Sequence, residues 1–341
     1  MRILVDAMGG DNAPDQIALG AIQAAKDFGC EVVLVGRGEA ILRALKDQGI
    51  ETLPKGVEIA NADDVVDMHD DPATVVKKKK DSSMVVGLNM LKEGGGDAFV
   101  SAGSTGALLV GATFLVKRIK GVKRPAIGTM IPAQGGRFYL LCDAGANHDC
   151  RPEMLTQFAV MGSAYYEKII GTERPRVGLI NIGAEETKGT ELQVAALPLL
   201  KNLPGIHFIG NVEARDLPLG GCDVAVCDGF TGNIVLKLTE GMGKFIGGAV
   251  KEVLMHNLKT KLGALLIASE FGAFKKTLDY KETGGAPILG VTRPVIKAHG
   301  SSDARAFKNA IRQAKSCVER DVSGAIEAGV ARQKAAAREN V

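Results

Sequence analysis

The sequence predicts an α/β protein in which a doubly wound, mostly parallel sheet lies between two layers of helices. Short apolar segments typical of buried strands alternate with longer helical patterns over most of the chain, an order typical of parallel sheets. Glycine is also abundant, with 43 of 341 residues, against a usual share of about 7 %. Many of the glycines stand where an expected strand gives way to a helix, as tight strand-to-helix turns require.

Each expected element can be placed from its pattern. Apolar runs bounded by Gly, Asp or Asn predict strands at residues 2–6, 31–35, 97–101, 126–131, 138–142, 176–182, 206–210, 223–227 and 295–297. Helical periodicity predicts helices at residues 15–28, 82–92, 105–117, 152–170, 191–203 and 301–330. The segment 134–136 is typical of a hairpin turn, so we expect one antiparallel pair at the edge of an otherwise parallel sheet.

From residue 234 to about residue 281 two consecutive helical patterns replace the alternation. We therefore expect one α/β domain over residues 1–330, with a helical hairpin excursion at 234–281. The last residues, 331–341, are expected to form a frayed tail.

The apolar tip of this hairpin, residues 262–268, is flanked by Lys259 and Lys261 on one side and by Lys275 and Lys276 on the other. Such a tip needs an apolar partner. Two alternatives stay open: a second copy of the chain, and the surface of an anionic membrane.

Composition narrows the class of protein. The net charge is +3, Trp is absent and aromatic residues make up 4 %, so neither a basic footprint nor a stacking surface for nucleic acid is indicated. The six cysteines form no Cys-x-x-Cys pair, which disfavours a zinc ribbon. The chain opens directly on a strand pattern and holds no apolar run of about 20 residues. We expect a cytoplasmic protein without a metal or cofactor.

One short pattern occurs twice at expected strand ends. Residues 103–106 (Gly-Ser-Thr-Gly) and 229–232 (Gly-Phe-Thr-Gly) each follow a buried strand and precede a long helix. The first N–H groups of a helix have no partner within it, and the helix dipole makes them attractive to anions. A Thr or Asp there can also serve only as a cap. The repetition favours a site for phosphate or another oxyanion.

Other strand ends carry related polar turns, at residues 6–14, 143–147, 181–190 and 298–303. In an open parallel sheet all these turns lie on one carboxyl edge, where ligands bind. The turn at Gly36–Gly38 is only part of a dinucleotide fingerprint, because a third glycine is missing and the turn follows the second strand.

Five segments together resemble the bacterial phosphate acyltransferase family over residues 1–330. They are residues 5–11 (Val-Asp-Ala-Met-Gly-Gly-Asp), 101–107 (Ser-Ala-Gly-Ser-Thr-Gly-Ala), 210–216 (Gly-Asn-Val-Glu-Ala-Arg-Asp), 228–233 (Asp-Gly-Phe-Thr-Gly-Asn) and 297–303 (Lys-Ala-His-Gly-Ser-Ser-Asp). The resemblance implies a fold like that of isocitrate and isopropylmalate dehydrogenases and phosphotransacetylases, in a homodimer. It implies transfer of a fatty acyl group from acyl carrier protein to inorganic phosphate, which gives acyl phosphate for phospholipid synthesis.

An anion site without a hydrolytic triad suits a reaction in which phosphate itself attacks the thioester, because such a reaction needs positioning, a cation and oxyanion donors. We place Lys188 and Asn233 in these catalytic roles. The residues expected to bind substrate or phosphate lie at the polar strand ends: Gly103, Ser104, Thr105, Gly106, Asn211, Asp228, Gly229, Thr231, Gly232, His299 and Ser301. Lys188 could instead be solvated, Asn233 could only cap its helix, and His299 could only brace its turn.

Partners follow from the same resemblance. An acidic acyl carrier protein would dock on the basic residues 77–80 or on the second basic cluster at 117–124, although either cluster could be a solvated surface. A membrane-bound acyltransferase that consumes the product would place the protein on the inner face of the cell membrane. Rival functions are a phosphotransacetylase that uses short acyl-CoA, a nicotinamide-dependent dehydrogenase, a covalent acyl-cysteine route and a non-catalytic binding module.

Overall fold

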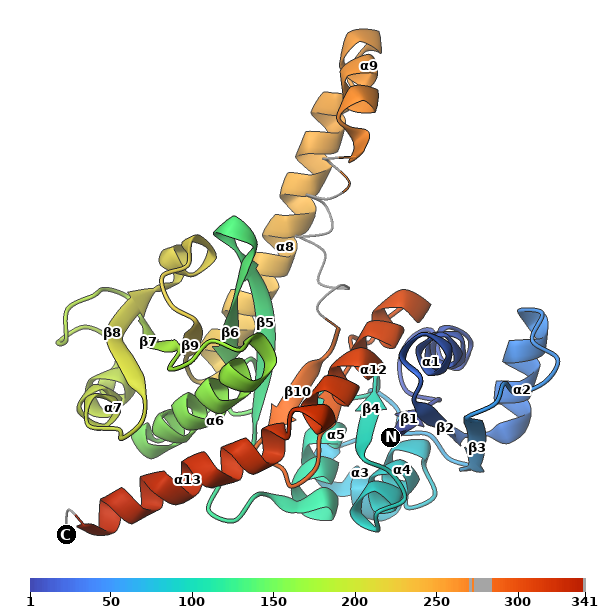
Figure 1. Ribbon diagram of the computed structural model, residues 1–341, viewed down its shortest axis with the longest axis horizontal. Coiled ribbons are helices and arrows are strands. Elements are labelled where there is room, and N and C mark those ends of the chain that lie inside the picture. Colours follow the sequence, from blue (N-terminus) through green and yellow to red (C-terminus); the bar gives the residue numbers. More distant parts are fainter. Residues whose placement is uncertain (270–271, 273–283, 340–341) are drawn as a thin grey trace.

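A computed structural model describes residues 1–269, 272 and 284–339 of the chain. One mixed sheet runs through the body of the molecule (Figure 1). Its strands, in spatial order, are β3 (Val57–Asn61), β2 (Glu31–Gly36), β1 (Arg2–Asp6), β4 (Ala98–Ser101), β11 (Val295–Lys297), β10 (Ala286–Leu289), β5 (Ala126–Ala133), β6 (Arg137–Cys142), β9 (Val224–Val226), β7 (Arg176–Asn181) and β8 (His207–Glu213).

The sheet consists of two parallel halves that run in opposite directions. Strands β3, β2, β1, β4 and β11 are parallel, as are β6, β9, β7 and β8, whereas the pairs β11–β10, β10–β5 and β5–β6 are antiparallel. Hairpin turns contribute two of these reversals, with left-handed backbone at Gly135 (φ 75°) and Gly290 (φ 90°). The expected antiparallel pair is therefore central, not at an edge, and the expectation of one common carboxyl edge is wrong.

Helices cover both faces of the sheet, which confirms the predicted α/β fold class. Alternation along β1 shows the two faces: Ile3 and Val5 belong to one buried apolar cluster and Leu4 to the other, as the strand period of two requires. The first face carries α1 (Asp15–Phe28), α2 (Gly38–Asp47), α6 (Pro152–Ile170), α7 (Glu191–Lys201), α12 (Ala304–Glu319) and α13 (Val322–Glu339). The second carries α3 (Pro72–Lys78), α4 (Ser83–Lys92), α5 (Thr105–Gly111) and its π-helical continuation η1 (Ala112–Lys117).

Several boundaries differ from those expected. The predicted helix 301–330 is two helices, because Asp321 takes a left-handed backbone (φ 48°) between α12 and α13. Helix α13 continues through residues 331–339, the segment expected to fray. Strands β3 and β10 and helix α2 were not among the expected elements. Both strands are short, and β10 contains Pro287, which weakens a strand pattern.

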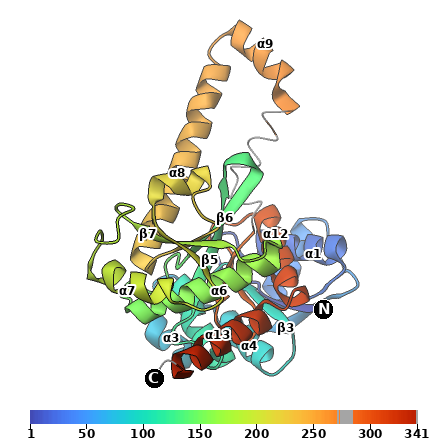
Figure 2. The same ribbon diagram turned by 60° about the vertical axis from the view of Figure 1, so that its left-hand side comes forward.

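Helices α8 (Gly229–Leu254) and α9 (Leu258–Leu266) form an arm that projects from the body (Figures 1 and 2). Large apolar side chains along this arm are exposed, among them Leu238, Phe245, Leu265 and Leu266. Lys275 and Lys276 lie outside the described residues. In the part of the chain that is described, no helix is both long and apolar enough to traverse a bilayer.

Candidate active site

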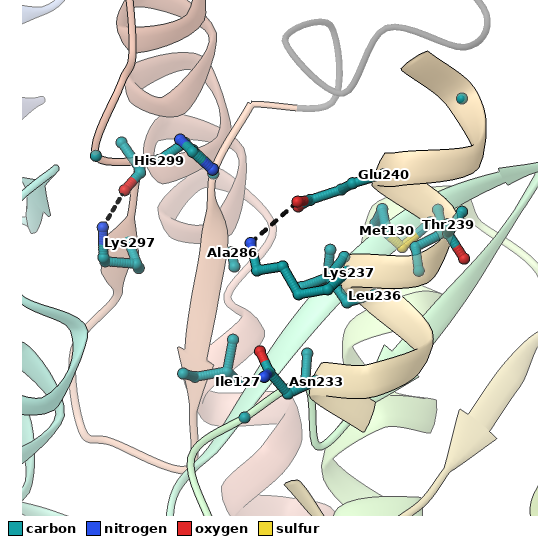
Figure 3. A pocket seen from close by; sticks show the side chains of 18 of the residues that line it. Ile127, Met130, Asn233, Leu236, Lys237, Thr239, Glu240, Ala286, Lys297 and His299 are labelled. Atoms are coloured by element: carbon teal, nitrogen blue, oxygen red, sulfur yellow. Dashed lines mark hydrogen bonds and ion pairs between the residues drawn. The ribbon is translucent and has the colours of Figure 1, made fainter. Parts of the chain in front are cut away.

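A cavity of about 1020 Å³ lies between α8 and the middle of the sheet. Figure 3 shows the α8 side chains facing β5 on one side and the β10–β11 segment on the other. Much of its wall is apolar, and the apolar residues that contribute to it include Ile127, Met130, Ile131, Pro132, Leu236 and Val250. A concave, mostly apolar space with a small number of polar groups is the usual form of a small-molecule site.

The end of β11 supplies a cationic part of the cavity wall. Lys297 lines the cavity, and its Nζ donates hydrogen bonds to the carbonyl oxygens of Ala102 (3.2 Å) and Ala298. Burial lowers the pKa of Lys297 to about 8, and the Lys237 ammonium also lowers it, whereas Asp6 and Asp11 oppose the shift. Lys297 is thus an amine that changes charge near neutral pH.

His299 lies beside Lys297 on the same wall (Figure 3). Its Nδ1 lies 2.9 Å from Ser301 Oγ and accepts from the Ser301 N–H at 3.2 Å. Burial lowers the pKa of His299, and Lys237 and Lys297 lower it further. The Lys237 and Lys297 ammonium groups repel each other, so an anion placed between them would be stabilised. The lowered pKa of His299 favours its neutral imidazole, which can hydrogen-bond to such an anion.

A buried carboxylate braces this end of the site. Asp6, only 1 % exposed, accepts hydrogen bonds from the hydroxyls of Ser83 and Ser101, both at 2.6 Å. The Ser101 hydroxyl in turn accepts from the Gly103 N–H at 3.0 Å. Burial raises the pKa of Asp6, while the two serines oppose that shift. Asp6 therefore holds the ends of β1 and β4 together beneath the cavity wall.

The first Gly-x-Thr-Gly turn reaches the cavity through one residue. Thr105, the first residue of α5, lines the cavity. Ser104 caps α5 through a long hydrogen bond from the Ala107 N–H (3.5 Å). A Cβ added at Gly106 would lie 2.8 Å from Pro72 Cγ. Gly103, Ser104 and Gly106 do not line the cavity.

The second Gly-x-Thr-Gly turn is bound into the fold instead. Asp228 accepts from the Thr231 N–H (2.9 Å) and hydroxyl (2.7 Å), and the Gly229 N–H donates to Asn147 O (2.7 Å). A Cβ at Gly232 would lie 1.9 Å from Asp143 O. This turn therefore fixes the start of α8, and Asn233 directly after it lines the cavity beside Ile127 (Figure 3).

Lys188 and Asn211 do not lie at the cavity. Lys188 is part of the loop that follows β7, and Asn211 of β8 contacts that loop. Asn181 Nδ2 donates to Lys188 O (2.9 Å), and Asn211 Nδ2 donates to Glu185 O (2.8 Å). Neither Lys188 nor Asn211 is among the cavity-lining residues. The structure thus brings together three predicted residues, Thr105, Asn233 and His299, and places Ser301 next to His299.

Sequence reasoning missed several residues of the wall. Lys297 was noted only as a strand end, and the signal that could have singled it out is a lysine that ends a short, otherwise buried strand. Asp11 and His148 also line the cavity, as does the ion pair of Lys237 with Glu240 (3.0 Å). Helix periodicity places Asn233, Lys237, Glu240 and Lys244 on one face of α8.

Two other kinds of chemistry find little support in the described residues. Among residues 1–269, 272 and 284–339, no three His, Cys, Asp or Glu side chains gather as a metal site would require. Burial raises the pKa of Cys150 to about 12 and raises the pKa values of Cys142 and Cys227 well above the usual thiol value. Few of these thiols would be thiolates, so an acyl-cysteine route is disfavoured.

Comparison with solved structures supports the fold. A phosphotransacetylase from Streptococcus pyogenes superposes with a TM-score of 0.62 over 94 % of both chains at 19 % identity. The EutD phosphotransacetylase from Staphylococcus aureus gives a TM-score of 0.60 over 93 % of this chain and 94 % of that one, at 16 % identity. At such low identities the likeness establishes the α/β architecture.

Comparison of sequences is more specific. A family profile described as "Fatty acid synthesis protein" matches residues 1–325. A phosphate acyltransferase from Thermoanaerobacter pseudethanolicus is 50 % identical over 323 residues, which span 94 % of this chain and 95 % of the relative. One from Thermoanaerobacterium thermosaccharolyticum is 48 % identical over 327 residues, 96 % of each chain. The chain therefore belongs to the phosphate acyltransferase family and is an enzyme of the transferase class.

Proposed function

We propose that the enzyme transfers a fatty acyl group from the thioester of acyl carrier protein to inorganic phosphate and releases an acyl phosphate for phospholipid synthesis. One observation carries the proposal: a single cavity joins a cationic wall, formed by Lys237 and Lys297 beside His299, to a long apolar wall along α8 and β5. The cationic part suits phosphate and the apolar part suits an acyl chain. The relatives named phosphate acyltransferase agree with this pairing.

The reaction needs no covalent enzyme intermediate. A phosphate oxygen attacks the thioester carbonyl carbon, the resulting oxyanion collapses, the C–S bond breaks and the carrier thiolate leaves. Asn233 exposes its amide in the cavity, and we assign it as a donor to that oxyanion. A cation beside the attacking phosphate offsets its charge.

Two lysines compete for this second role. Lys188 is the candidate that the sequence favours, but its backbone carbonyl accepts a hydrogen bond from Asn181 Nδ2, and Lys188 does not line the cavity. Lys297 lies in the wall with its ammonium fixed by two carbonyl oxygens. We therefore assign the charge-offsetting role to Lys297 and keep Lys188 as the alternative.

The geometry also favours one of the two basic clusters as the dock for an acidic carrier protein. Helix α3 contacts the start of α5 through Pro72, and Lys77, Lys78 and Lys80 at its other end are exposed. By contrast, Lys117 lies at the end of η1, with the rest of α5 and η1 between it and Thr105 in the cavity. Charge reversal at Lys77, Lys78 and Lys80 should raise KM for the carrier-bound substrate, with kcat nearly unchanged.

The projecting arm provides a candidate contact surface for a second copy or for an anionic membrane. Leu265 and Leu266 are 73 % and 80 % exposed, and Lys259 and Lys261 precede them. Peripheral binding on the inner face of the cell membrane would release acyl phosphate near a membrane-bound acyltransferase. Leu265→Glu with Leu266→Glu should abolish co-sedimentation with anionic liposomes while activity in solution persists; loss of a dimer instead would assign the arm to the second copy.

One assay tests the reaction. The enzyme is mixed with a hexadecanoyl thioester of acyl carrier protein, with and without phosphate, and acyl phosphate is trapped with hydroxylamine. We expect acyl hydroxamate only when phosphate is present. Thioester loss that is equally fast without phosphate would identify a thioesterase, and preference for a short acyl-CoA would identify a phosphotransacetylase. Binding without turnover would identify a non-catalytic module.

A further inference from the structure

The face of α8 that lines the cavity includes an unusual set of residues. Going outward from Asn233, this face presents Leu236, Thr239, Gly243, Gly247 and Val250, a spacing of three to four residues that places them in one row. Two successive members of the row are glycines. Glycine inside a helix is destabilising by about 0.5–1 kcal/mol relative to alanine, so its presence twice calls for a reason.

The fold of the described residues gives no such reason. A Cβ added at Gly243 or at Gly247 would have no described neighbouring atom within 4 Å. By contrast, a Cβ at Gly232 in the same helix would lie 1.9 Å from Asp143 O, so that glycine is required by packing. At Gly243 and Gly247 the missing side chain leaves open space inside the cavity.

The surroundings of that space match an alkyl chain. The opposing wall includes Met130, Ile131 and Pro132 from β5, which offer apolar surface and no side-chain hydrogen-bonding group. Asn233, Lys237, Lys297 and His299 lie nearer the start of α8, and farther along the helix Lys244 and Lys251 also line the cavity. The alkyl stem of a lysine can cover apolar surface while its ammonium turns to water. With a rise of 1.5 Å per residue, Gly243 lies about 15 Å along the helix from Asn233 and Gly247 about 21 Å.

We propose that the acyl chain of the substrate extends along α8 and that Gly243 and Gly247 set the length of chain the enzyme accepts. The thioester carbonyl lies at Asn233, and the chain passes between the two glycines and β5. A larger side chain at either glycine would close the slot at that depth. This inference rests on the proposed acyl transfer to phosphate and adds to it a chain-length determinant.

Three variants test it: Gly243→Leu, Gly247→Leu and the matched control Gly241→Leu. Gly241 is also a helical glycine of α8 with no described neighbouring atom within 4 Å of an added Cβ, but it does not line the cavity. All three variants should fold, because leucine is a better helix former than glycine. Circular dichroism and the thermal unfolding midpoint verify this.

The readout is kcat/KM for phosphate-dependent transfer from butyryl, octanoyl, dodecanoyl and hexadecanoyl thioesters of acyl carrier protein. We expect the ratio of hexadecanoyl to butyryl kcat/KM to fall about ten-fold or more in Gly243→Leu. The fall should be smaller in Gly247→Leu, because Gly247 lies near the far end of an extended hexadecanoyl chain. The cut-off should come at a shorter chain in Gly243→Leu than in Gly247→Leu, and Gly241→Leu should keep the wild-type profile.

Three outcomes would overturn the inference. An unchanged chain-length profile in folded Gly243→Leu and Gly247→Leu would show that the chain lies elsewhere. Equal loss of activity at every chain length would show that the glycines serve another contact, such as a second copy of the chain. A shift in Gly241→Leu as large as in the cavity variants would show that the effect is not local. Failure of the proposed function is distinguishable, because the wild-type enzyme would then form no acyl phosphate from any thioester.

Discussion

The same four-residue pattern begins two helices of this enzyme and performs a different task in each. At α5 the turn presents Thr105 to the cavity, while its cap is weak, with 3.5 Å between Ser104 Oγ and the Ala107 N–H. At α8 the turn is bound on several sides, by Asp228, by Asn147 O and by the close approach of Gly232 to Asp143 O.

The difference teaches that a glycine-rich helix start is an anion site only if its N–H groups remain available. At α8 the N–H groups of Gly229, Thr231 and Gly232 already have partners within the fold. What α8 brings to the cavity is the side chain of Asn233, held in place by that rigid turn. The turn before α5 therefore contributes Thr105 to the cavity wall, and the turn before α8 holds Asn233 in position.

The largest loss of activity should follow from removing the side chain of Asn233. Asn233→Ala should lose about 10²–10³ in kcat, because one oxyanion donor is lost, with little change in KM for phosphate. Thr231→Val is the matched control, because it breaks the hydroxyl hydrogen bond to Asp228 without touching the cavity. Equal loss in both variants, measured as phosphate-dependent turnover, would mean that Asn233 acts only through the position of the helix.

The next largest loss of activity should follow from removing Lys297, the cation of the cavity wall at the end of β11. Lys297→Met should raise KM for phosphate and lower kcat/KM about ten- to a hundred-fold, which corresponds to about 1.5–3 kcal/mol for a hydrogen bond to a charged group. The pKa of Lys297 is lowered to about 8. Its ammonium form prevails below that pH, so wild-type kcat/KM for phosphate should fall as pH rises through about 8.

Two controls accompany the pH profile. In Lys297→Arg the charge persists at all these pH values, so the alkaline fall should disappear. A loss in Lys188→Ala as large as that in Lys297→Met would support the alternative lysine.

Much of the fold could be predicted because its strands are strong local signals. Runs such as Val32–Val35 are apolar and β-branched, and glycine or aspartate marks their ends. Strand direction was not predictable in the same way, because it depends on distant pairing such as that of Ile288 with Ile127. The short β10 that makes this pairing reverses the second half of the sheet and separates the strand ends into two groups.

The site could be predicted in part for the same reason. Asn233, Thr105 and His299 lie in or just after the turns that follow strands, so polar turns at strand ends indicate them. Lys297 was missed because a lysine at a strand end is usually solvated, and its burial arises from the packed ends of β1 and β4. Lys188 follows a strand as well, but β9 lies between β7 and β6, so its loop is displaced from the cavity.

A smaller effect, on the free energy of unfolding, should distinguish how tightly the two turns are packed. Gly232→Ala places a Cβ 1.9 Å from Asp143 O, and such overpacking costs about 1–3 kcal/mol in the free energy of unfolding. Gly106→Ala meets only Pro72, at 2.8 Å from its Cγ, and gains helix propensity that offsets part of the strain. Urea denaturation should rank Gly232→Ala as clearly the less stable. The reverse order would mean that the α8 turn can relax.

The smallest effect on stability should follow from removing the side chains that cap α8 and α5. Asp228→Ala removes an acceptor of two hydrogen bonds, 2.9 Å and 2.7 Å long, and should lower the free energy of unfolding by about 1–2 kcal/mol, the upper part of the range for lost caps. Ser104→Ala removes one 3.5 Å bond and should cost about 0.5 kcal/mol, the lower end of that range. Asp228→Asn keeps a good capping acceptor and should remain near wild type. If the two alanine variants were equally stable, the second turn would be no more firmly held than the first, and Asn233 would need another source of alignment.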